Sequence, residues 1–280
     1  MIDHLDSTTI LLYFLGTRTR DRLPTMASPP PSALYTPTFL LALLTTLLLC
    51  LTLRALAILP SRSPKPRLRT PGTPTRVVIV LGSGGHTQEM LYLLRDLDPA
   101  KYTHRTWVVS SGDAFSAGRA VAFESEMESR AGSGHGKNVG PGTFDVVTVP
   151  RARSIHQSLL TTLGSSLRCL CACFAPLLGF TTASSMAQAP TKDLPDLIVT
   201  NGPATACILV FAALLLRFFN VRGAQSRGKC RTVYAESFAR VKTLSLSGKL
   251  LVRVVDRFLV QWEGLEGVGG GRAEFVGVLV

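Results

Sequence analysis

The stretch Arg76–Gln88, RVVIVLGSGGHTQ, decides the fold predicted for this chain. The aliphatic run Val77–Leu81 has the composition of a buried strand, and it leads into the glycine-rich turn Gly82–Gly85. A helix is predicted after the turn, over Thr87–Leu97. Backbone N–H groups at such a junction point at whatever lies above it, which favours phosphate or diphosphate. His86 adds a group that can titrate near neutral pH, although a tight turn with an exposed histidine and no ligand is the alternative.

Strand and helix signals alternate along the chain after residue 75. The predicted strands are Val77–Leu81, Arg105–Ser110, Asp145–Val149, Leu197–Thr200, Thr232–Glu236 and Phe258–Gln261. The predicted helices are Thr87–Leu97, His156–Leu178, Ala204–Phe219 and Leu246–Val255. Apolar strands followed by helices are typical of a parallel sheet covered on both faces. We therefore predict an α/β fold, a single Rossmann-like parallel-sheet domain that binds ligands at the carboxyl ends of its strands.

The chain has 280 residues, and we divide it into four segments. Residues 1–31 are an N-terminal extension, 32–59 a transmembrane anchor, 60–75 a Pro- and Arg-rich linker, and 76–280 the α/β domain. The last segment, of about 205 residues, is long enough for one such domain but not for two.

The anchor is predicted from Ser32–Leu53, which carries no charged residue and is longer than the roughly 20 residues that span a bilayer. A basic flank begins at Arg54, and no acidic residue follows before Glu89. The positive-inside rule then places the α/β domain in the cytosol. A cleaved signal peptide is the alternative, but the run is long and begins late in the chain. The sequence leaves open whether translation starts at Met1 or Met26.

The composition narrows the classes of partner. The formal charge is +12 and aromatic residues make up 7% of the chain. These aromatic residues are not interleaved with the basic ones, so nucleic acid is not an expected partner, whereas anionic lipid headgroups are. The six cysteines include no CxxC pair, so we predict free thiols in a reducing compartment and no metal site. No bound cofactor is predicted.

The predicted helix near residues 156–178 is unusually apolar for a helix at a protein surface. Gly164 and Arg168 interrupt it, which argues against a second membrane span. Because Arg151 and Arg153 precede it, we expect a helix in the headgroup layer with these two arginines contacting the membrane. An ordinary core helix is the alternative.

Polar motifs follow two further predicted strands. Asn201-Gly202 can bind a ligand or cap the next helix, and Glu236 can bind hydroxyls, act as a base or pair with Arg240. The hydroxyl and basic residues that come next suit phosphate, although a capped basic helix would look the same. The predicted diphosphate-binding set is Gly82, Ser83, Gly84, Gly85, Thr87, Asn201, Gly202, Arg240, Ser245, Ser247 and Lys249.

Taken together, these motifs resemble a known family. The segments VVIVLGSGGHTQEML, VPRARSIHQS, DLIVTNGPAT, YAESFARVKTLSLSGKLL and DRFLVQW are similar, in this order, to the asparagine-linked-glycosylation protein 14 family. The resemblance runs from about Arg76 to Val280. It implies one half of a GT-B type glycosyltransferase, in the membrane-anchoring subunit of the UDP-N-acetylglucosamine transferase that adds the second sugar on dolichyl diphosphate.

The resemblance also implies partners and a reaction. The UDP-sugar is expected to be bound mainly by a separate subunit, asparagine-linked-glycosylation protein 13, which this chain recruits to the cytosolic face of the endoplasmic reticulum membrane. The nuclear membrane, and a larger complex with the enzymes of the preceding and following steps, are further expectations. The reaction adds β-1,4 N-acetylglucosamine (GlcNAc) to GlcNAc-diphosphodolichol with inversion and without a bound metal.

Inverting transfer needs a base near the attacking hydroxyl, and His86 or Glu236 could supply it. We prefer His86 because it lies beside the glycine turn. The apolar end Val278, Leu279 and Val280 is the expected docking site for the partner. The first 25 residues and the glycine-rich insertion 131–142 depart from the family pattern.

Three other functions are considered. A non-catalytic membrane scaffold shares the anchor and the docking end, so the sequence does not separate it from a transferase subunit. A self-sufficient lipid-linked glycosyltransferase needs a second domain, for which the chain is too short. A dinucleotide-binding oxidoreductase is disfavoured because GSGGH lacks the GxGxxG spacing.

Overall fold

A computed structural model describes residues 37–60, 73–133, 142–153, 157–180, 193–202 and 204–278. The predictions for residues 1–31, for most of the linker and the insertion, and for Leu279 and Val280 lie outside the described residues. The chain divides into two units, Met1–Thr52 and Leu53–Val280.

Helix α2, Pro37–Ile58, coincides with most of the predicted anchor. It is one of two described helices that are long and apolar enough to cross a membrane, by length and composition. The other is the segment Thr161–Leu178 of a later helix, which is partly buried, whereas the apolar window of α2 is not buried at all. The anchor prediction therefore has a matching helix.

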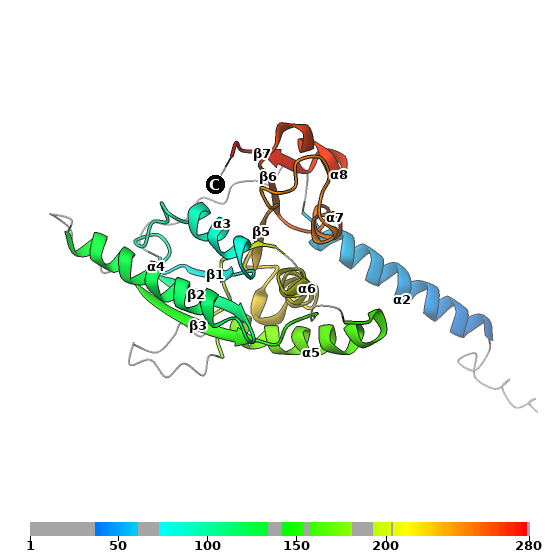
Figure 1. The fold of residues 1–280 in the computed structure, drawn as a ribbon. Helices are drawn as coiled ribbons and strands as arrows, with labels where there is room; N and C mark the ends of the chain where they lie inside the picture. Colours follow the sequence, from blue (N-terminus) through cyan, green and yellow to red (C-terminus); the bar gives the residue numbers. More distant parts are fainter. Residues whose placement is uncertain are drawn as a thin grey trace, which may run out of the picture. The chain divides into compact units, whose positions relative to one another are not determined.

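The second unit contains a parallel sheet of seven strands in the order β3-β2-β1-β4-β5-β6-β7 (Figure 1). The strands are β1 Arg76–Val80, β2 His104–Ser110, β3 Thr143–Val149, β4 Leu197–Asn201, β5 Arg231–Ala235, β6 Arg257–Val260 and β7 Ala273–Phe275. The prediction of a single Rossmann-like parallel-sheet domain is confirmed, and each of the first six strands lies within two residues of its predicted limits.

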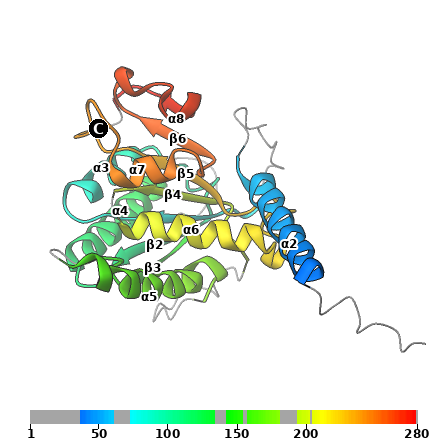
Figure 2. The same cartoon turned by 90° about the vertical axis from the view of Figure 1, so that its right-hand side faces the viewer.

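Helices cover both faces of this sheet. They are α3 Gly85–Leu93, α4 Ala114–Ser133, α5 Leu159–Leu178, α6 Ala204–Phe218, α7 Leu246–Leu251 and α8 Val268–Gly271, with single turns η2 Val221–Gly223 and η3 Glu263–Leu265. Figure 2 shows α5, α6 and α7 side by side over one face, while α3 and α4 lie over the other.

The alternation of side chains along β1 builds a core on each face. Val78 and Val80 pack with α5 and α6, and Val77 and Ile79 pack with α3 and α4. Because both faces are covered, all five residues of β1 are buried, which is why the strand reads as a continuous aliphatic run.

Helix α4 was not predicted. Its buried face includes Glu124, which accepts hydrogen bonds from Arg105 Nε at 2.8 Å and Trp107 Nε1 at 2.6 Å, both on β2. A buried carboxylate interrupts the apolar pattern by which such a helix is recognised in a sequence.

Helix α5 combines features of both predictions made for it. Cys169, Cys173 and Leu177 lie on its buried side in the core with α6. Leu163, at 77% exposure, and Leu167 lie on its exposed side. The helix therefore has one core face and one open apolar face.

The last turn of α2 packs within the α/β unit. Arg54 donates from Nε to the carbonyl of Phe218 at 2.8 Å and from Nη2 to that of Arg217 at 3.0 Å, at the end of α6. Arg217 in turn donates to the carbonyl of Ile58 at 2.8 Å. A cation at these terminal carbonyls is favourable because they have no partner within the helix.

Candidate active site at the carboxyl edge of the sheet

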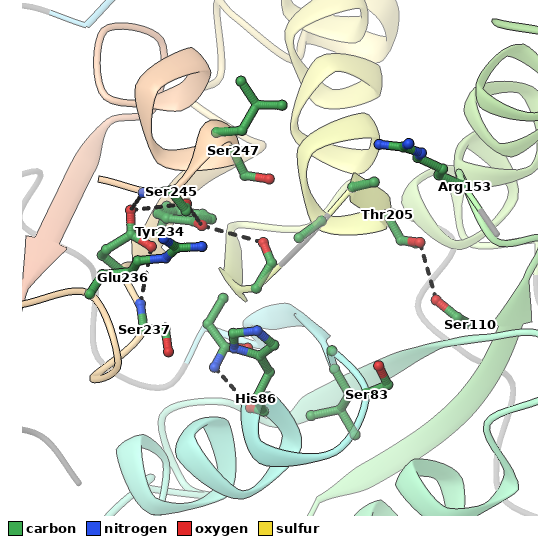
Figure 3. Close-up of a pocket in the computed structure, with 18 of the residues that line it drawn as sticks. Ser83, His86, Ser110, Arg153, Thr205, Tyr234, Glu236, Ser237, Ser245 and Ser247 are labelled. Carbon is green, nitrogen blue, oxygen red and sulfur yellow. Dashed lines mark hydrogen bonds between the residues drawn. The ribbon is translucent and has the colours of Figure 1, made fainter. Parts of the chain in front are cut away.

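A pocket of about 660 Å³ lies at the carboxyl ends of the strands, around the junction of β1 with β4. The helices that follow β1 and β4 lie on opposite faces, and such a change of direction opens a crevice in α/β sheets. Its lining comes from the ends of the first five strands and the start of α6 and α7 (Figure 3).

Most of the predicted site residues line this pocket. They are His86 and Glu236, with Gly82, Ser83, Asn201, Gly202, Arg240, Ser245 and Ser247 from the diphosphate set, and also Arg151 and Arg153. Gly84, Gly85, Thr87 and Lys249 are not part of the lining. Thr87 is buried because its hydroxyl turns inward, against the carbonyl of Gly82 and the Ser116 hydroxyl. Thr87 therefore stabilises the glycine turn from its buried side and does not face the pocket.

Two glycines make room for the His86 side chain. A Cβ at Gly82 would lie 2.7 Å from His86 Cβ, and one at Gly202 would lie 3.0 Å from His86 Cγ. Gly202 also has a φ of 81°, which side chains rarely adopt. Part of what the sequence predicts as a phosphate-binding glycine pattern is therefore a cradle for the imidazole.

His86 has a carboxylate neighbour that the sequence analysis missed. Its Nδ1 lies 3.6 Å from Glu89 Oε2, and its side chain is 31% exposed. Burial acts to raise the pKa of Glu89, but the contact with His86 and a hydrogen bond from Ser237 outweigh it and hold that pKa below its usual value. The signal was available, because residues three apart share one face of a helix.

Asn201 lines the pocket and carries a buried acceptor, Oδ1. Its Nδ2 donates to the carbonyl of His86 at 2.8 Å, which fixes the amide. Its Oδ1 is buried and has no hydrogen-bond partner among the described residues, and the whole residue is 2% exposed. A buried acceptor of this kind is costly unless a ligand donates to it.

Glu236 is held from two sides. It is 1% exposed, and its Oε2 accepts from the backbone N–H and the hydroxyl of Ser245, both at 3.1 Å. Its Oε1 accepts from the N–H of Ser237 at 3.2 Å. Ser245 caps α7 by accepting from Gly248 N at 2.9 Å. The carboxylate thus joins the loop after β5 to the start of α7. Among the described residues it makes no hydrogen bond or ion pair with Arg240, the alternative partner that the sequence suggested.

Three arginines line the pocket and suit an anionic ligand. Arg151 donates to the Ser111 carbonyl at 2.9 Å, and Arg153 to the Gln157 carbonyl at 3.3 Å. Arg240 is exposed on the loop after β5. Guanidinium groups bind phosphate oxygens well, so the two arginines expected at the membrane lie where a diphosphate could also reach them.

The C-terminal end carries exposed apolar side chains. β7 pairs with β6 as the edge strand, and Phe275, Val276 and Val278 are all exposed, the last at 56%. A docking role for Val278 stays a prediction.

Comparisons with known proteins agree with this architecture. Residues 77–279 match the family model described as oligosaccharide biosynthesis protein Alg14 like. The chain is 43% identical over 219 residues to the UDP-N-acetylglucosamine transferase subunit alg14 of Aspergillus fumigatus, covering 66% of this chain and 96% of that protein. It is 34% identical over 197 residues to the subunit ALG14 of Homo sapiens, covering 70% and 80%. The match spans the sheet and the pocket, and the chain belongs to the Alg14 family, as the resemblance of its motifs predicted.

Proposed function

We propose that this chain is the acceptor-binding and membrane-anchoring subunit of a heteromeric UDP-N-acetylglucosamine transferase. In this proposal, the complex adds a β-1,4-linked GlcNAc to GlcNAc-diphosphodolichol with inversion. The observation that carries it is the carboxyl-edge pocket, which combines a cradled histidine with arginines and hydroxyls. The relatives are named as subunits of a UDP-N-acetylglucosamine transferase, which supports a role within a complex.

The pocket residues divide the proposed work between binding and proton transfer. Arg151, Arg153 and Arg240 bind the diphosphate of the acceptor, and Ser83 adds a hydroxyl. Asn201 Oδ1 accepts a hydrogen bond from the acceptor sugar. These contacts place the 4-hydroxyl of the acceptor GlcNAc beside His86.

His86 acts as the general base in this mechanism. Its Nε2 takes the proton of the 4-hydroxyl as that oxygen attacks C1 of the donor sugar. The new O4–C1 bond forms on the face opposite the leaving group, and the bond from C1 to the UDP oxygen breaks with its electron pair going to UDP. Attack from the opposite face inverts C1, which gives the β linkage.

The proposal also includes a partner and a location. Asparagine-linked-glycosylation protein 13 supplies most of the UDP-GlcNAc site and docks at the apolar end formed by Val278, Leu279 and Val280. Residues 32–59 anchor the chain in the endoplasmic reticulum membrane. The proposal extends to the nuclear membrane as a second location and to a larger complex with the enzymes of the preceding and following steps. The α/β domain faces the cytosol, since the basic flank follows the anchor.

The test is transferase activity in membranes that contain this chain alone, the partner alone, or both. Labelled UDP-GlcNAc and GlcNAc-diphosphodolichol are supplied, and the labelled lipid product is extracted. Product only with both chains supports the split enzyme. Product from this chain alone would show that its one domain binds both substrates. No product with both chains would contradict the proposal.

A pocket variant separates an acceptor-binding subunit from an inert scaffold. His86→Ala should lower transfer by about 100- to 10,000-fold while the partner still co-purifies. Unchanged transfer by this variant would favour the scaffold.

A further inference from the structure

Glu89 is the one carboxylate beside Nδ1 of His86 in the described part of the site. The two residues lie three apart on the first turns of α3, with 3.6 Å between Nδ1 and Oε2. This separation is slightly longer than a hydrogen bond, and catalytic contacts are often long before substrate binds. Nε2, at the other corner of the ring, is then left for the ligand.

The Glu89 carboxylate is itself fixed by two other elements of the sheet. Ser237, in the loop after β5, donates its hydroxyl to Oε1 at 2.8 Å. Asn201, at the end of β4, has its Nδ2 3.5 Å from Oε2. A glutamate on a helix surface needs no such partners, so their presence indicates that the position of this carboxylate matters.

Two glycines confine the imidazole that Glu89 faces. Gly82 and Gly202 lie close against it, and neither position has room for a Cβ without a shift of the ring. Besides His86, the titratable groups with a charged form that line the pocket include Glu236, Arg151, Arg153 and Arg240, and Glu89 lies behind the imidazole. Of these, Glu236 is engaged with Ser245 and Ser237. The carboxylate that faces His86 is therefore that of Glu89.

We propose that Glu89 is a positioning residue for His86, held in place by Ser237; this rests on the proposed function. The carboxylate accepts the proton on Nδ1 as a hydrogen bond, which leaves the Nε2 lone pair directed at the acceptor hydroxyl. When Nε2 takes the hydroxyl proton, the imidazolium that forms faces a carboxylate and is stabilised. Glu89 itself gains no proton in the step.

The test uses the full chain together with its partner in membranes, with the variants Glu89→Gln, Ser237→Ala, His86→Ala and the double variant His86→Ala/Glu89→Gln. Glu89→Gln should lower kcat about 10- to 100-fold with little change in KM for the acceptor, because binding groups are untouched. Ser237→Ala, which leaves the carboxylate in place, should lower kcat by roughly 3- to 10-fold. Glu126→Gln on α4, an exposed carboxylate paired with Arg130, is the matched control and should leave kcat unchanged.

The double variant distinguishes positioning from a structural role. If Glu89 acts through His86, the substitution Glu89→Gln should have no further effect once His86 is alanine. A further fall by the same factor, or an unchanged kcat in both Glu89→Gln and Ser237→Ala, would overturn the inference.

Failure of the proposed function gives a different result. If the wild-type complex makes no product, the proposed function fails and this inference fails with it. If the wild-type complex is active and His86→Ala is equally active, the inference fails together with the proposed role of His86 as the base. If His86→Ala lowers kcat and Glu89→Gln and Ser237→Ala do not, the inference alone fails.

Discussion

His86 and Glu236 line the same pocket, and their surroundings differ in exposure and in hydrogen bonding. His86 is partly exposed and lies against two glycines. Glu236 is buried, and both of its oxygens accept hydrogen bonds from Ser237 or Ser245. An isolated sequence offers both as bases, but their environments suit one to react and the other to hold a loop.

The difference shows that the ends of two strands in one sheet can have different roles, one in the proposed chemistry and one in holding a loop. After β1 the chain places a partly exposed imidazole at the pocket. After β5 the chain uses a carboxylate to join the strand end to α7, since a buried charge is tolerated only when it is hydrogen-bonded. The shape of the pocket then depends on Glu236, and its proposed chemistry depends on His86.

The largest expected effect on stability comes from disturbing the hydrogen bonds by which Glu236 holds the loop after β5 against α7. In Glu236→Gln one oxygen becomes an NH₂ group, which would meet an N–H donor of Ser237 or Ser245. The free energy of unfolding should fall by about 2–3 kcal/mol, and Tm of the complex by roughly 5–10 °C. Thermal unfolding of the detergent-solubilised complex measures this.

Glu263→Gln, an exposed carboxylate on the turn η3, is the control and should leave Tm unchanged. A Glu236→Gln complex that keeps its Tm but loses transfer would reverse the comparison, because Glu236 would then be the better candidate for the base.

A smaller effect is expected from filling the space that Gly202 leaves for the His86 ring. Gly202→Ala places a Cβ 3.0 Å from the His86 ring at a φ of 81°. The strain should cost about 1–2 kcal/mol of stability and the displaced ring should lower kcat several-fold, roughly 5- to 50-fold. Steady-state transfer and thermal unfolding of the same preparation separate the two effects.

Gly118→Ala is the control, because Gly118 lies within α4 with nothing within 4 Å of an added Cβ. It should be as active as wild type. A fully active Gly202→Ala would show that the imidazole tolerates displacement, and the cradle would lose its proposed purpose.

The strands could be predicted because each is a short aliphatic run that becomes buried on both faces of a parallel sheet. Helix α4 could not be predicted, because its Glu124 can be buried only where Arg105 and Trp107 donate hydrogen bonds to it. Both residues lie on β2, which packs against α4 in the folded chain. A buried charge is recognisable in a sequence only together with its partner.

The candidate site divides in the same way. His86 could be predicted from its place after the glycine turn. Glu89 was missed because its partners, Ser237 and Asn201, come from β5 and β4 and meet it only in the folded sheet. Thr87 was predicted as a ligand contact because the sequence does not show that its hydroxyl turns inward.

The smallest expected effect concerns Arg153, which contacts neither His86 nor Glu236 in the proposed mechanism. It is exposed and lines the pocket, and it was first predicted to contact the membrane. If it binds the diphosphate, Arg153→Ala should raise KM for the acceptor about 3- to 10-fold with kcat unchanged, since phosphate binding is shared by ground state and transition state. Arg119→Ala, on the exposed side of α4, is the matched control and should leave KM unchanged.

The acceptor used in that assay decides between the two roles of Arg153. A water-soluble, short-chain analogue of GlcNAc-diphosphodolichol needs no membrane, so a phosphate contact should raise KM for it as much as for the long-chain lipid. A membrane contact should raise KM only for the lipid embedded in a bilayer, and more strongly at low ionic strength, because headgroup attraction is screened by salt. A KM that rises only in the bilayer assay would show that Arg153 contacts the membrane. The diphosphate would then be bound by the remaining lining residues.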